Sequence, residues 1–177
     1  MQTYEVTVRF VTDYLQARYH EAAKKELENY TSKGVKKTDE GAWKLFLYHD
    51  SKGIYIPNVH LRNSFVKAGR EIKLKKQRRS LEQWVISNVI VLPSNIYLKK
   101  KTPDKTITSY PLKKDGNRCT VTHPVINSGT AINFQVKILD EMEDFAIKEI
   151  VRIAGKNYGI GARRRDMFGR FEIISFK

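Results

Sequence analysis

The amino-acid sequence predicts an α+β fold in which strands and helices share one core. Residues 4–10 and 132–138 alternate apolar and polar side chains, which is typical of strands with one buried face. Residues 61–72 instead repeat apolar side chains at helical spacing. The chain of 177 residues suits one domain, so we expect residues 1–177 to form a single unit.

Further elements follow from local composition. Residues 13–30 consist largely of good helix formers and predict a helix. Residues 43–48 and 54–57 predict two short strands. Residues 84–92 are apolar on both faces, which favours a strand in the middle of the sheet.

A basic hairpin is expected at about residues 99–122. Two β-prone arms flank Asp115-Gly116, a dipeptide suited to a tight turn. The arms have little apolar content, so this hairpin should project from the core. Residues 141–154 then predict a helix that ends at Gly155, and residues 170–176 predict the last strand.

The charge balance points to an anionic partner. Lysine and arginine number 33 against 19 aspartate and glutamate, a net charge of +14, and nucleic acid is the first candidate. No apolar run is long enough to cross a membrane and no signal peptide is evident, so we expect a cytoplasmic protein without a membrane partner. The lone Cys119 and the spacing of the four histidines predict neither a metal site nor a cofactor.

The helix from residue 61 is strongly basic on its other faces. Residues 65–80 contain seven lysines and arginines against one acid, Glu71, which is more than solubility requires. We predict that this helix contacts phosphates. The candidate residues are Lys67, Arg70, Lys73 and Lys76, with His60 as a further RNA contact.

A glycine- and arginine-rich segment, residues 158–171, precedes the last strand. Its glycines let the backbone turn tightly and approach a ligand, and its arginines offer forked donors that match phosphate. The glycines follow a helix and precede a strand, which excludes a dinucleotide-binding fingerprint, and a P-loop sequence is lacking. The alternative is a turn with solvated arginines. The candidate residues are Gly159, Gly161, Gly169, Arg163, Arg164, Arg165 and Arg170.

This segment resembles the glycine-rich loop of the RAMP superfamily, the RNA-binding proteins of CRISPR systems. Residues 56–65 and 125–134 are similar to further segments of CRISPR backbone subunits. The resemblance implies a ferredoxin-like (RRM-like) antiparallel sheet with helices on one face and the glycine-rich loop before the last strand. It also implies binding of single-stranded RNA, with single-stranded DNA as the alternative, and self-association along it or assembly with other CRISPR-type subunits.

The hairpin resembles the thumb of those subunits, which implies RNA contacts from Lys113 and Lys114. Tyr110 and Phe168 are candidates for stacking on bases. Two other functions remain open: a metal-independent endoribonuclease with His20 as general base, or an inhibitor that mimics the fold within a CRISPR complex. Binding without catalysis is preferred, because nothing in the sequence orients His20.

Overall fold

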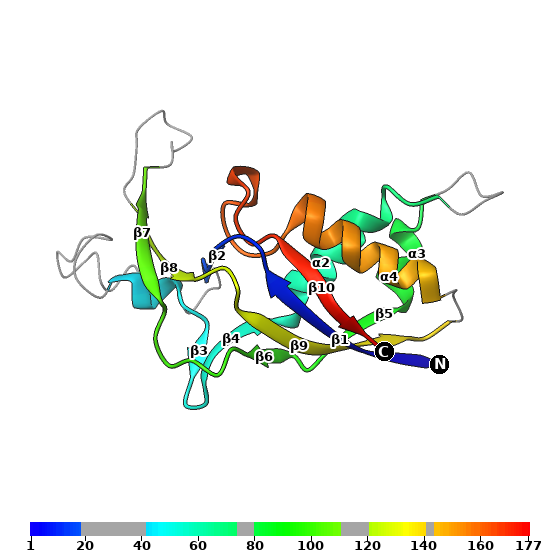
Figure 1. The fold of residues 1–177 in the computed structure, drawn as a ribbon, viewed down its shortest axis with the longest axis horizontal. Coiled ribbons are helices and arrows are strands. Elements are labelled where there is room, and N and C mark those ends of the chain that lie inside the picture. Colours follow the sequence, from blue (N-terminus) through cyan, green and yellow to red (C-terminus); the bar gives the residue numbers. More distant parts are fainter. Residues whose placement is uncertain (19–41, 74–79, 111–120, 141–143) are drawn as a thin grey trace.

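We describe the protein from a computed structural model, for residues 1–18, 42–73, 80–110, 121–140 and 144–177. In this part of the chain, four strands form an antiparallel sheet in the order β10-β1-β9-β5 (Figure 1). The strands are β1 (Gln2–Phe10), β5 (Val89–Leu92), β9 (Ala131–Ile138) and β10 (Phe171–Phe176). The predicted strands at 4–10, 132–138 and 170–176 are confirmed.

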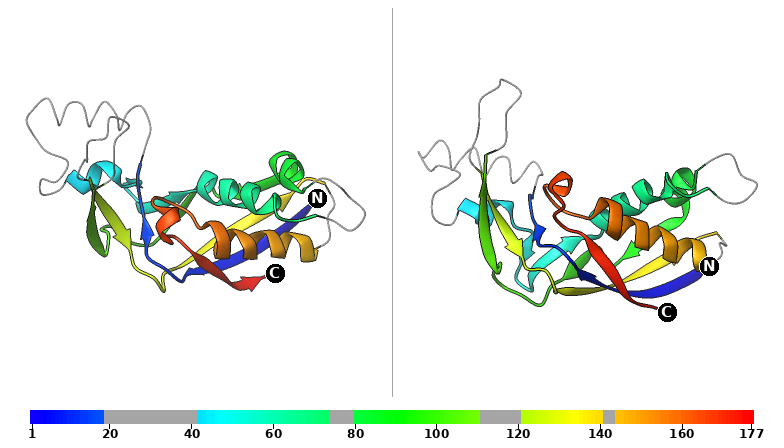
Figure 2. Two further views of the ribbon diagram at one scale, coloured as in Figure 1. Left: turned by 90° about the horizontal axis from the view of Figure 1, so that it is seen from above. Right: turned by 45° about the horizontal axis from the view of Figure 1, so that its top comes forward.

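Helices cover one face of this sheet, as Figure 2 shows. They are α2 (Asn58–Gly69), α3 (Glu82–Asn88) and α4 (Asp144–Ile153). The apolar stripe of α2 packs with that of α4 onto the inward side chains of β1 and β9, which excludes water from the core. The α+β, ferredoxin-like prediction is therefore confirmed. Core residues from these elements include Leu61, Phe65, Ile147, Ile150, Val6, Val8, Phe134 and Val136.

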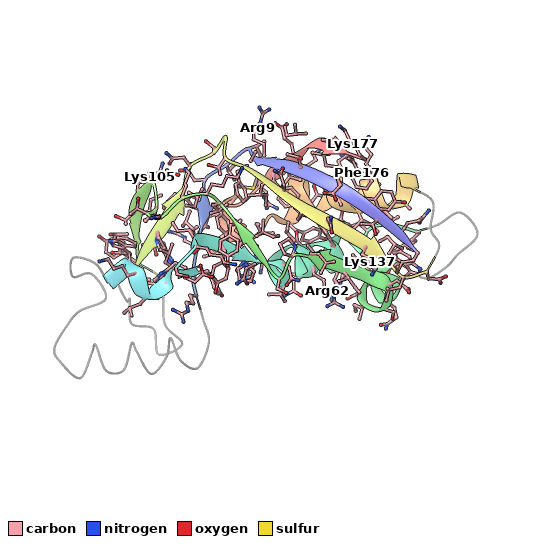
Figure 3. The ribbon with its side chains drawn as sticks, turned by 90° about the horizontal axis from the view of Figure 1, so that it is seen from below. Arg9, Arg62, Lys105, Lys137, Phe176 and Lys177 are labelled. Atoms are coloured by element: carbon pink, nitrogen blue, oxygen red, sulfur yellow. The ribbon has the colours of Figure 1, made fainter. Side chains whose placement is uncertain are left out.

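The opposite face of the sheet is polar along the central strands β1 and β9, and we call it the open face. Arg9 pairs with Glu172 at 2.6 Å, and the Gln135 amide donates to the Glu5 carboxylate at 2.5 Å. Figure 3 shows Arg9 and Lys137 on this side. The open-face side chains of β1 and β9 are Thr3, Glu5, Thr7, Arg9, Asn133, Gln135 and Lys137.

Two smaller sheets lie beyond the main sheet, away from the chain termini (Figure 1). The first has the order β2-β8-β7, with β2 (Tyr14–Leu15), β7 (Lys105–Ser109) and β8 (Val121–Ile126). The second has the order β3-β4-β6, with β3 (His49–Asp50), β4 (Gly53–Pro57) and β6 (Asn95–Tyr97). A 3-10 helix, η1 (Ala42–Phe46), precedes β3.

Strands β7 and β8 pair antiparallel, with Lys105 opposite Val125 and Ser109 opposite Val121. The first arm agrees with the prediction, whereas β8 extends to Ile126, beyond the predicted end of the hairpin at about residue 122. Residues 111–120, with the predicted turn at Asp115-Gly116, lie outside the described residues. The base of β8 is more apolar than expected, because Val125 is fully buried. The hairpin therefore begins in the core.

The strand predicted at 84–92 is confirmed only over Val89–Leu92, and its predicted position in the middle of the sheet is wrong. Residues up to Asn88 form α3, which buries Val85, and β5 is an edge strand. Its outer edge is covered by α2, because the side chains of Arg62 and Asn58 donate to the carbonyl groups of Val89 and Val91. These hydrogen bonds explain how an apolar strand can lie at the edge of the sheet without leaving its backbone carbonyl groups unpaired.

Two predictions nearer the N-terminus also need correction. Tyr14 and Leu15 form β2 rather than the start of a helix over 13–30, and residues 19–30 lie outside the described range. Residues 43–46 belong to η1 rather than to a strand. The strand predicted at 54–57 is confirmed as β4.

The helix predicted to end at Gly155 continues instead as a π-helical turn, η2 (Ala154–Tyr158). Gly155 serves close packing, because an added Cβ would lie 2.1 Å from the Phe171 carbonyl oxygen in β10. The chain turns away at Gly159, whose φ is 63°. This turn opens the segment that carries the arginines.

Candidate nucleic-acid interface

The glycine- and arginine-rich segment forms a closed loop, residues 159–170, which we call the Gly-Arg loop. The Ile160 N–H donates to the Gly169 carbonyl at 3.0 Å and closes its neck. Gly159, Gly161 and Gly169 all have positive φ, between 63° and 82°. A Cβ on Gly169 would lie 1.9 Å from the Ile160 carbonyl oxygen, so this crossing requires glycine.

The Gly-Arg loop is docked on the segment that connects β1 to β2. The Ala162 N–H donates to the Leu15 carbonyl at 2.8 Å, and the Thr12 hydroxyl donates to the Met167 carbonyl at 2.8 Å. Such bonds fix the loop backbone, so the arginines extend from a defined support. This support includes a short 3-10 turn, η3 (Arg164–Asp166).

Arg163 faces the hairpin. A groove of about 680 Å³ separates the Gly-Arg loop from the end of β7 and from β8. Arg163 pairs with Asp166 at 2.8 Å, and its guanidinium lies 5.9 Å from the centre of the Phe168 ring. Burial and the Arg163 charge lower the pKa of His123, although a hydrogen bond to the backbone opposes this. The groove-lining residues are Ser109, Tyr110, His123, Gly161, Ala162, Arg163, Arg164, Arg165 and Asp166.

Arg164 and Arg165 also lie close enough to α2 for their charges to act on Lys67. Partial burial and then the charges of Arg164, Arg70 and Arg165 hold the pKa of Lys67 below its ordinary value. Arg70 is compensated by Glu82 at 2.6 Å. Within the described ranges, Lys67, Arg164 and Arg165 form no ion pair. We call these three residues the cationic cluster, and its unneutralised charge suits an anion.

His60 stands in the first turn of α2 beside this cluster. Its Nδ1 lies 3.4 Å from the Tyr14 hydroxyl, and the Tyr48 ring meets its ring edge-on at 5.3 Å. Burial and the Arg164 charge lower the pKa of His60 to about 4. The imidazole is therefore neutral at pH 7, so it would contact RNA as an uncharged ring and not as a cation.

Arg170, a sequence candidate for phosphate binding, is only 9% exposed. Its guanidinium lies beneath the Gly-Arg loop, where Nη2 donates to the Arg164 carbonyl at 3.2 Å. Its Nε and Nη1 have no partner within the described structure. Burial and the Arg164 charge lower the pKa of Arg170. Its evident role is to support the loop, and direct phosphate contact stays a prediction.

The other candidates are dispersed. Tyr110 is 63% exposed at the groove, and Phe168 is half-buried in the loop. Lys73 is exposed beyond the end of α2. Lys76, Lys113, Lys114 and His20 lie outside the described residues.

Sequence reasoning missed a row of aromatic side chains next to His60. Tyr48 lies 6.0 Å from Tyr55, and Tyr55 lies 5.8 Å from Tyr97 between ring centres. We call these three residues the tyrosine row. A signal existed, because Tyr55 alternates with buried Ile54 and Ile56 and so must face away from the core.

Metal ligands do not gather in the part of the chain that is described: no group there contains three or more His, Cys, Asp or Glu in reach of one ion. None of the described helices is long and apolar enough to cross a membrane.

Comparisons with known proteins bear on the fold. No protein-family model matches the sequence, and no curated protein matches it. A subunit of the Type III-B Cmr-beta complex bound to cognate target RNA aligns with a TM-score of 0.56 and 18% identity. The alignment covers 99% of this chain, which spans 59% of that subunit. A subunit of a Type IV-B CRISPR complex aligns with a TM-score of 0.51 and 9% identity, over 99% of this chain and 90% of that one.

The chain therefore has the fold of CRISPR complex subunits. This agrees with the fold that the resemblance noted in the sequence implies.

Proposed function

We propose that this chain binds single-stranded RNA in a CRISPR-type assembly and holds the RNA phosphates at the cationic cluster. The observation that carries the proposal is the charge of Lys67, Arg164 and Arg165, which form no ion pair among the described residues, on a backbone fixed by hydrogen bonds. Guanidinium groups on a fixed support lose little freedom when they bind phosphate. The similar Cmr-beta subunit comes from a complex that is bound to RNA, which supports the same ligand here.

Replacing the three residues of the cationic cluster, Lys67, Arg164 and Arg165, together by alanine tests this function. We expect roughly a 100-fold loss of affinity for a single-stranded RNA, because three charge-assisted contacts disappear. The matched control replaces Arg9, Lys137 and Lys177, three cations outside the cluster that Figure 3 labels. Both variants lose three positive charges, so equal losses of affinity would mean that net charge alone, and not the cluster, binds RNA.

Assembly along RNA is the second part of the proposal. The β7–β8 hairpin lies at the end of the molecule opposite the termini, where it can reach a neighbouring subunit (Figure 1). Contacts between unlike surfaces that do not close a ring extend into filaments. Light scattering with RNAs of increasing length should show multimers that grow with the RNA. The proposal of hairpin-mediated assembly fails if the multimers persist when a short glycine-serine turn replaces residues 111–120.

A further inference from the structure

The side chains of the tyrosine row point away from the hydrophobic core, at the small β3-β4-β6 sheet. Tyr55 and Tyr97 are directly opposite each other on β4 and β6, so their side chains share one face. The next pair, Ile56 and Ile96, is fully buried on the other face. All three tyrosines keep part of their surface open to solvent. The fold therefore presents aromatic rings that the core does not need.

The tyrosine row and the cationic cluster meet at His60. Tyr48 contacts the ring of His60 at 5.3 Å, and the Arg164 charge acts on the same imidazole. Ring contacts thus follow one another from His60, at the start of α2, through Tyr48 and Tyr55 to Tyr97 on β6. A strand whose phosphates lie at Arg164 would bring its next nucleotides toward these rings.

The chemistry of the row suits bases rather than phosphates. At its far end the Tyr97 hydroxyl donates to Asp50 at 2.7 Å, and Lys52 stands 5.9 Å from the Tyr97 ring centre. The Asp50 carboxylate would repel a phosphate and partly compensates Lys52. An aromatic face, in contrast, accepts any base by stacking.

The backbone that carries two of these rings is held in place by Gln16. The Tyr48 N–H donates to the side-chain oxygen of Gln16 at 2.7 Å, and the Gln16 amide donates to the Tyr55 carbonyl at 2.9 Å. Gln16 is fully buried, so its amide is a fixed bridge between the two tyrosines. A preformed stacking surface avoids the entropic cost of ordering side chains upon binding.

The usual base platform of an RRM-like fold is not built here. In RRM domains, aromatic side chains on the exposed face of the four-stranded sheet stack on bases. The open-face side chains of β1 and β9 contain no aromatic ring. If this chain holds unpaired bases, the aromatic surface for them lies elsewhere.

We propose that Tyr48, Tyr55 and Tyr97 stack on unpaired bases of the strand whose phosphates lie at the cationic cluster. This inference rests on the proposed RNA-binding function and adds a base site to its phosphate site. It requires single-stranded nucleic acid, because paired bases are not free to stack on side chains.

The test compares a short oligouridylate with an abasic oligoribonucleotide of the same length. Tyr55→Leu, which keeps an apolar side chain but removes the ring, should weaken binding of the oligouridylate roughly tenfold. Tyr55→Phe should bind normally, since it keeps the ring. Neither substitution should change affinity for the abasic strand. Equal affinity of Tyr55→Leu and wild type for oligouridylate, or equal losses on both ligands, would overturn the inference.

Phe176→Leu is the matched control, because it removes an aromatic ring at the C-terminal end of β10, on the main sheet (Figure 3). It should leave both affinities unchanged. If wild type binds neither oligonucleotide, the proposed function itself fails, which is a distinct outcome.

A measurement on the wild-type protein covers the case in which Tyr55→Leu does not fold. Photo-crosslinking with 4-thiouridine RNA should attach the RNA to peptides that contain Tyr48, Tyr55 or Tyr97. Crosslinks confined to other peptides would show that the bases lie elsewhere and would refute the tyrosine row as their site.

Discussion

The open face of the sheet and the cationic cluster both carry basic side chains, but they differ in how the charge is compensated. On the open face, Arg9 pairs with Glu172 at 2.6 Å. At the cluster, Lys67, Arg164 and Arg165 have no acidic partner in the described part of the chain. Partial burial and then the charges of Arg164, Arg70 and Arg165 lower the pKa of Lys67. A net charge of +14 therefore does not locate an anion site, whereas a group of cations whose charges act on one another without an ion pair among the described residues does.

The two regions also differ in their backbone. The open face belongs to regular strands, where alternation alone sets the direction of each side chain. The cluster depends on a loop whose glycines adopt positive φ and whose neck closes between Ile160 and Gly169. A substitution that distorts the loop backbone should therefore disturb the cluster. Four predictions test how the cluster and the open face differ.

The largest effect is expected at Gly169. Its φ is 72°, and an alanine Cβ would lie 1.9 Å from a backbone oxygen, so Gly169→Ala should destabilise the protein by about 3 kcal/mol or more. Gly129→Ala is the control, because Gly129 has a φ of 86° but an added Cβ meets nothing within 4 Å. It should cost about 1–2 kcal/mol. Chemical denaturation measures both, and similar losses would mean that the loop neck tolerates a side chain.

The second prediction concerns His60, whose pKa is lowered from 6.5 to about 4. Between these values the unfolded protein binds more protons than the folded one, so stability should fall as the pH is lowered from about 6.5 to about 4. The limit is about 1.4 kcal/mol per pH unit. His60→Gln should reduce this slope, and His49→Gln, at an exposed position, should not. Titration of His60 by NMR should also give a higher pKa in Arg164→Gln.

These features differ in how far the sequence could predict them. Local patterns were sufficient for β1 and β9, whose alternation persists over a whole strand, and for the position of the Gly-Arg loop. They failed for α3, because Trp84 to Asn88 is apolar enough for either a strand or a helix and its packing against Gly69 decides between them. The prediction that Gly155 ends the last helix failed for the same reason, because this glycine is required by a contact with Phe171 that only the tertiary structure creates.

Which cations form ion pairs with acidic side chains could not be predicted from the local sequence. Arg9 and Glu172 are 163 residues apart, and only sheet pairing brings them together. The tyrosine row depends likewise on the pairing of Tyr55 with Tyr97. The burial of Arg170 beneath the Gly-Arg loop has the same origin, because its neighbour Thr12 comes from the opposite end of the chain.

The third prediction compares two half-buried lysines, Lys67 on α2 and Lys137 on β9. Lys67→Gln should weaken RNA binding up to roughly tenfold, because one phosphate contact is lost. It should also reduce the slope of log affinity against log salt by about 0.7. Lys137→Gln removes the same charge from the open face and should change neither quantity. Equal slopes for both variants would contradict the difference between the two regions.

The smallest effect should come from removing the ion-pair partner of a cation on the open face. Glu172→Gln removes the partner of Arg9, and stability should change by less than about 1 kcal/mol, since the side chains of this pair are 51% and 47% exposed. If compensation is what keeps RNA from the open face, the freed arginine should raise the affinity for RNA by roughly two- to threefold at low salt. The gain should disappear in Arg9→Ala combined with Glu172→Gln. A gain that survives in this double variant would show that general charge, rather than release of Arg9, attracts the RNA.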